Sequence, residues 1–161
     1  MYGERILTVL GNRATRPITD FISRYIAVTA DMTSAVWNTV AAHEIATVTG
    51  AVEILILPEC TGTLVGATAT LTLGDETTAD SIIASSAAPS LAIGEWWADA
   101  TMTRTILTRT LMNGLDIVVV GKDIGYTIGT AALTSGSILF HMFWSPISSD
   151  GLVVAGAGGA L

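Results

Sequence analysis

A chain of 161 residues is long enough to form one domain that buries roughly two thirds of its unfolded surface without disulfide or metal cross-links. Half of the residues are hydrophobic, 13% are charged, and the net charge is −7 with Lys122 as the only lysine, so binding to nucleic acid phosphates, which needs clustered Lys and Arg, is not expected. The single cysteine, Cys60, excludes an internal disulfide framework and suits a reducing cytoplasm. We expect no Sec signal at the start and no membrane span, because no apolar run approaches ~20 residues.

The first part of the chain is predicted to be an N-terminal arm over residues 1–20. Residues 6–10 form a short strand candidate with no hairpin partner nearby, and the residues after it suit turns and loops. An unpartnered strand can pair with the open edge of another subunit, and arginine can bind carboxylates there in a bidentate way. The residues expected to take part in docking are Arg5, Ile6, Leu10, Arg13 and Arg16.

The next stretch is predicted to contain two strands. Residues 21–29 alternate between apolar and polar positions, whereas residues 34–42 fit either a short helical turn, capped by Thr33 or Ser34, or a strand. Residues 43–57 are typical of a strand that Pro58 ends, with Gly50 as either a bulge or a turn. A loop is expected over residues 60–63.

The middle of the chain contains the clearest alternation. Residues 67–73 predict a strand with Ala69, Leu71 and Leu73 facing inward and threonines facing outward. Residues 78–84 favour one or two helical turns, with Thr78 as N-cap. Residues 102–111 are expected to form a strand that the Asn113-Gly114 turn joins to residues 117–120, a β-branched run expected to be covered on both sides.

The last third is predicted to hold the centre of the fold. After a strand over residues 124–130, the pattern over residues 138–144 places one set of bulky residues on each face, which is typical of a central strand. One face carries Ile138, Phe140, Met142 and Trp144, and the other carries Leu139, His141 and Phe143.

These short strands at hairpin spacing predict an all-β fold, an antiparallel β-sandwich or barrel that is jelly-roll-like, with one short helical turn and extended termini. The predicted organisation is an arm over residues 1–20, a β-sandwich domain over residues 21–154 and a Gly/Ala-rich tail over residues 155–161. Val153 and Val154 are expected to dock on a neighbouring surface, because they are apolar and the glycines after them allow close backbone approach.

No residue pattern indicates catalysis, a metal or a cofactor. His43, His141 and Cys60 lack the close pairwise spacing of a zinc site, and a lone cysteine in an apolar protein is usually inert. We therefore expect no enzymatic activity, although residues distant in sequence can still meet in space. Trp96 and Trp97 are candidate interaction residues, with one expected in the core and the other available for contact.

The paired carboxylates and the glycine-rich tail do not indicate a calcium site or a dinucleotide site. The pairs Glu53/Glu59 and Asp75/Asp80 lack the alternating acidic loop of an EF-hand and are expected to be solvated turn charges. The glycine-rich tail mimics the start of a dinucleotide fingerprint, but a helix and a further strand would have to follow it.

Four segments resemble small β-rich virion structural proteins of tailed bacteriophages: VTGAV (48–52), ATATLTLG (67–74), DIGYTIGTAALTSG (123–136) and FHMFWSPIS (140–148). The resemblance implies a capsid decoration protein of the virion that forms a homotrimer and holds major capsid protein subunits together, without nucleic acid or membrane as partner. The alternative is a head-fibre or tail-associated β-sandwich module that binds a host glycan or another virion protein, with its ligand near Trp96, Trp97 and Tyr126.

Overall fold

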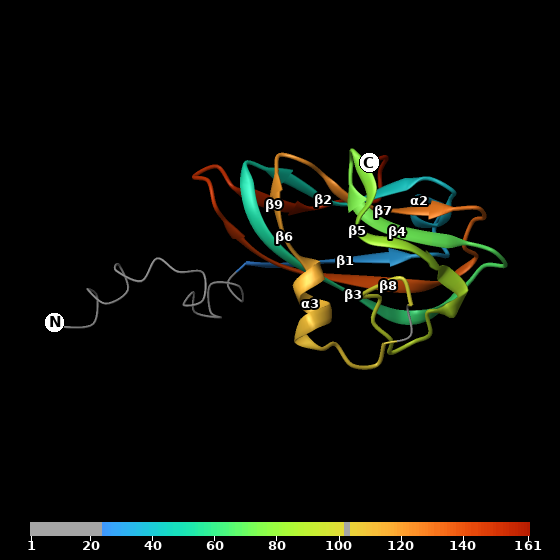
Figure 1. Cartoon of the computed structure of the whole chain (residues 1–161). Coiled ribbons are helices and arrows are strands. Elements are labelled where there is room, and N and C mark those ends of the chain that lie inside the picture. Colours follow the sequence, from blue (N-terminus) through green and yellow to red (C-terminus); the bar gives the residue numbers. More distant parts are fainter. Residues whose placement is uncertain (1–23, 102–103) are drawn as a thin grey trace.

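The structure is a computed structural model that describes residues 24–101 and 104–161 (Figure 1). Its strands are β1 (Tyr25–Asp31), β2 (Ala42–Thr49), β3 (Ala51–Val65), β4 (Thr70–Asp75), β5 (Thr78–Ala87), β6 (Asp116–Val120), β7 (Ile124–Gly129), β8 (Ser135–Pro146) and β9 (Leu152–Ala155). The helical elements are α2 (Ala35–Asn38), the 3₁₀ turn η2 (Ala88–Ser90) and α3 (Arg109–Leu115). The predicted all-β class is confirmed.

The strands form two antiparallel sheets with the topology of a jelly roll. One sheet has the order β1-β8-β3-β6, and the other has the order β5-β4-β7-β2-β9. The pairs β1·β8, β2·β7, β3·β6 and β4·β5 are nested, so that the chain is a long antiparallel ribbon wound over both sheets. This winding is the defining feature of a jelly roll, and β9 adds one strand beside β2.

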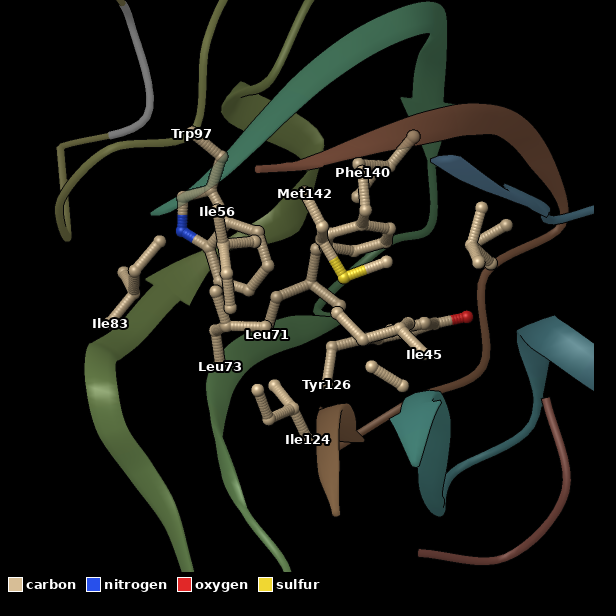
Figure 2. Packing of buried hydrophobic residues seen from close by; sticks show 14 of the residues in the cluster. Ile45, Ile56, Leu71, Leu73, Ile83, Trp97, Ile124, Tyr126, Phe140 and Met142 are labelled. Atoms are coloured by element: carbon tan, nitrogen blue, oxygen red, sulfur yellow. The ribbon is translucent and has the colours of Figure 1, made fainter. Parts of the chain in front are cut away.

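The core lies between the two sheets (Figure 2). Ile138, Phe140, Met142 and Trp144 all point inward from β8, which lies between β1 and β3, so its predicted central position is confirmed. From the opposite sheet, the ring of the buried Tyr126 stacks on Phe140 at 5.5 Å between centroids. Bulky side chains of both sheets thus interdigitate, which is how a sandwich core reaches crystal-like density.

Strand β3 is longer than the sequence predicted. Gly50 is a turn with φ of 61°, and the strand then continues through Pro58 and the expected loop at residues 60–63. Pro58 is tolerated because its carbonyl faces away from β8 and accepts a bond from the Trp97 backbone N–H at 3.0 Å. The missing proline N–H therefore costs the ladder to β8 nothing.

The prediction of helical turns over residues 78–84 is wrong, because these residues belong to β5. Asp75 pairs with Thr78 across a tight hairpin, and its carboxylate accepts the backbone N–H of Thr77 at 2.9 Å. This side-chain bond makes the turn, and the β-branched residues that follow continue as a strand that buries Ile83.

The expected strand over residues 102–111 and its Asn113-Gly114 hairpin are also wrong. Residues 109–115 form α3, in which Asn113 and Gly114 lie inside the helix. The physical reason is an apolar stripe at helical spacing, in which Leu107 and Leu111 are partly buried and Leu115 is buried, with α3 packed on β3.

Strand β6 is an edge strand and is not covered on both sides as predicted. Val118 and Val120 are 49% and 64% exposed, whereas Val119 faces the core. The short helix α2 corresponds to the helical one of the two alternatives for residues 34–42.

The structure describes the C-terminal end of the chain but not residues 1–23. Arg5, Ile6, Leu10, Arg13 and Arg16 lie outside the described residues, and their role remains a prediction. At the other end, Val153 is buried and Val154 is half exposed in β9. The tail continues along β2 of its own chain, since the N–H groups of Gly156 and Gly158 donate to the carbonyls of Ile45 and Glu44. Docking of this end on another subunit stays untested.

Candidate binding surface

The outer face of the β1-β8-β3-β6 sheet brings together side chains that are far apart in the sequence. Register pairs His141 with Ala27 and Leu57, and it pairs Tyr25 with Phe143 one step along the sheet. Paired residues lie on the same face of a sheet, so aromatic and polar side chains from β1 and β8 meet on the side away from the core.

Residues 95–97 extend this face beyond the end of β6. Trp96 pairs with Glu59 of β3, and the Cys60 N–H donates to the Glu95 carbonyl at 2.8 Å. Because successive side chains on an extended segment point to opposite faces, Trp96 lies with Glu59 on the outer face and Trp97 points into the core. The expectation that one tryptophan is buried and the other available agrees with this geometry.

Three polar side chains form a continuous hydrogen-bonded row on this surface. The Tyr25 hydroxyl lies 2.7 Å from Nδ1 of His141, and Nε2 of His141 lies 2.9 Å from a carboxylate oxygen of Glu59. With a neutral imidazole, Nε2–H donates to Glu59 and Nδ1 accepts from the tyrosine hydroxyl. Glu59 therefore fixes both the tautomer and the orientation of the ring.

Aromatic rings surround this row. The Tyr25 ring lies 6.0 Å from the His141 ring and 5.0 Å from the Phe143 ring, between centroids. The Trp96 ring lies 5.9 Å from His141 on its other side. Tyr25 is 45% exposed, and the side chains of His141 and Glu59 remain 21% and 33% exposed. We name Tyr25, Glu59, Trp96, His141 and Phe143 the aromatic surface.

The row has the order of a nucleophile, a base and an orienting carboxylate, which is the general arrangement for an activated hydroxyl. In many enzymes that use such a row, the site also excludes water and holds donors for developing charge. The aromatic surface lies on the outer sheet face, and none of its residues lines the cleft of about 310 Å³ beside β5 and β6. The exposed Tyr25 ring, the partly buried Trp96 ring and the adjacent hydrogen-bonding groups suit ligand binding.

The other soft ligands lie apart from this surface. His43 is buried, with Nε2 2.9 Å from the carbonyl of Thr39. Cys60 is buried, and its thiol donates to the Gly62 carbonyl at 3.2 Å. Burial raises the pKa of the Cys60 thiol, which makes it a poor nucleophile. Among residues 24–101 and 104–161, no group of three or more His, Cys, Asp or Glu side chains is arranged to hold a metal ion.

The other residues singled out from the sequence belong to the hydrophobic core or to a turn. Trp97 is fully buried, and its indole N–H donates to Ser86 at 3.1 Å. Tyr126 is also buried, and its hydroxyl donates to the Trp37 carbonyl at 2.5 Å, so neither residue is available to a ligand. Asp75 pairs with Lys122 at 3.4 Å and closes the β4–β5 turn.

Comparison of the chain with protein-family models, with curated proteins and with solved structures found no match. Within the part of the chain that the structure describes, no helix is long and apolar enough to cross a membrane.

Proposed function

We propose that this chain is a non-enzymatic structural protein of a tailed-bacteriophage virion, a capsid decoration protein that forms a homotrimer on the outer head surface and holds the major capsid protein subunits together. The observation that carries the proposal is the jelly-roll topology, an architecture that viral capsid domains use repeatedly. Because one fold hosts many functions, the topology supports the proposal only together with the surface of the molecule.

The exposed apolar residues of the surface support an assembling protein. Val118 and Val120 are exposed on β6, and elsewhere in the chain Ile93 and Ile106 are 66% and 74% exposed. A sheet edge that carries exposed β-branched residues is a ready surface for another chain. Closed cyclic symmetry is the usual way in which copies of one chain cover such a surface.

A second function has its own supporting observation. The aromatic surface places the exposed ring of Tyr25 and the partly buried ring of Trp96 next to a carboxylate, an imidazole and a hydroxyl. This suits a sugar ring that stacks on an aromatic face and exchanges hydrogen bonds through its hydroxyls. Jelly rolls are also lectin domains. A head-fibre or tail-associated module that binds a host glycan is therefore the alternative function.

Cosedimentation with capsids assembled without this protein tests the first proposal. The chain is expected to pellet with expanded capsids at a fixed ratio to the major capsid protein and to raise the temperature at which the capsids disrupt. Full recovery in the supernatant over micromolar concentrations would count against a decoration role. A glycan array on the same preparation tests the alternative.

A further inference from the structure

A cleft lies between the open edges of the two sheets. Strand β6 ends one sheet and β5 ends the other, and residues of both strands line a cavity of about 310 Å³. Ile82, Ile117, Val119 and Ile124 contribute apolar lining, and Asp75 and Lys122 lie at its polar side. The cleft is large enough for an inserted apolar side chain.

The edge of β6 contains no bulge, proline or lysine that would hinder pairing with another strand. β6 pairs with β3 in unbroken register over its whole length, so it contains no bulge. Its sequence, DIVVV, contains neither proline nor lysine, and Val118 and Val120 are exposed. An edge of this kind presents backbone donors and acceptors to a further strand.

The chain itself carries a segment that suits this edge. Residues 6–10 read ILTVL, which is as long as β6, rich in apolar residues and free of charge. Residues 1–23 contain Arg5, Arg13 and Arg16 against two acidic residues, a net charge of +1, which leaves −8 on residues 24–161 from the total of −7. Residues 1–23 therefore have a net charge opposite to that of the body that they would contact.

We propose that the β6 edge binds residues 6–10 of a second copy as an additional strand of the sheet, with an apolar side chain of that segment inserted into the cleft. Exchange between copies rests on the homo-oligomer of the proposed function. The span between residue 10 and β1 is 14 residues, up to about 46–50 Å when extended. This exceeds the ~14 Å radius of gyration expected for a domain of this size, so a neighbouring copy is within reach.

Mixing two cysteine variants of the full chain tests the exchange directly. One population carries Val9→Cys and the other carries Val118→Cys, and the native Cys60 is buried and leaves the assay clear. Mild oxidation of the mixture is expected to give a disulfide between the two populations. A Thr15→Cys population, whose cysteine lies outside the proposed strand, is the matched control and is expected to cross-link at least tenfold less.

Two further variants examine each side of the contact without touching the core. Val9→Pro removes a backbone N–H from the added strand, and Val120→Lys places a charge on the exposed acceptor edge. Each is expected to weaken association at least tenfold in light scattering. Thr15→Pro and Val40→Lys, the latter at an exposed valine that follows α2 and lies outside the proposed contact, are the matched controls and are expected to keep the wild-type mass.

Several results would overturn the proposal. One is a disulfide that forms at high dilution within a Val9→Cys/Val118→Cys double variant but does not form between the two single-variant populations. Another is an oligomer whose mass in light scattering is unchanged by both Val9→Pro and Val120→Lys. A full chain that is monomeric at micromolar concentration would overturn both this contact and the homo-oligomer. Cosedimentation with capsids is a separate readout, so a failed strand exchange with intact capsid binding removes this inference alone.

Discussion

The adjacent Trp96 and Trp97 give a matched pair for testing how residues 95–97 are held against β3. Trp97 is fully buried between the sheets, beside Ile56, Leu73 and Ile83 (Figure 2). Trp96 pairs with Glu59 and lies on the outer face. We expect Trp97→Ala to destabilise the fold strongly and Trp96→Ala to do so only slightly, although the two changes delete the same side chain one position apart.

The size of the effect follows from burial. A buried aromatic side chain removes about 150–250 Å² from water, which at about 25 cal/mol per Å² corresponds to ~4–6 kcal/mol. Replacements of buried Trp or Phe by Ala cost about 3–5 kcal/mol in practice. Trp97→Ala should therefore lower the free energy of unfolding by ~4 kcal/mol. Ser86 keeps its own bond to the Ala84 carbonyl at 2.9 Å and adds little to the loss.

Urea unfolding followed by circular dichroism measures both variants. We expect ~4 kcal/mol for Trp97→Ala and about 1 kcal/mol for the half-buried Trp96→Ala, with equal m-values if both remain two-state. Because a domain of this size has about 5–15 kcal/mol in total, Trp97→Phe is a milder companion should Trp97→Ala fail to fold. Equal losses at the two positions would refute the assigned alternation.

Three further predictions concern single side chains. Hydrogen bonds from Thr77, and the nearby Lys122 ammonium, hold the pKa of Asp75 well below its ordinary value, so the stability that this carboxylate contributes is present above the unfolded pKa of about 4 and is lost as the pH falls below it. Asp75→Ala should thus lower the free energy of unfolding by about 1–2 kcal/mol equally at pH 7 and pH 5, and by progressively less below pH 4. Asp80→Ala, at an exposed carboxylate, should change it little at any of these pH values. A loss of stability in Asp75→Ala that grows as the pH falls would contradict the lowered pKa of Asp75. The Cys60 thiol, buried and with a raised pKa, should resist an aromatic disulfide reagent at pH 8 until the protein unfolds, and rapid labelling of the folded chain would show that this part of the core is open. On a glycan array, His141→Ala should abolish any signal of the wild type, with His43→Ala as a control that removes the buried histidine, and a signal that survives His141→Ala would place the ligand elsewhere.

The alternation of side chains along the sequence correctly predicted which residues of β4 and β8 face the core. The bulky residues of β8 predicted its central place, and Ala69, Leu71 and Leu73 were correctly assigned to the core. The same reasoning failed at β6, because a run of β-branched residues looks alike in a central strand and in an exposed edge. The helical spacing of Leu107, Leu111 and Leu115 was present in the sequence, but the Asn-Gly turn signal outweighed it.

The aromatic surface could not be found from sequence. Tyr25 and His141 are 116 positions apart, and His141 and Glu59 are 82 apart, so only the strand register brings them together. Register depends on the pairing order of the whole jelly roll, which the pattern of a single strand does not contain. Glu59 was further hidden by Pro58, which predicted a strand end where the strand in fact continues.

Electron microscopy of purified source particles, labelled with an antibody to this chain, tests the virion assignment most directly. We predict regularly spaced label on the outer surface of the head, over protrusions that accommodate copies of the jelly roll. Particles that carry no label, with all of the protein left in the soluble part of the lysate, would contradict it.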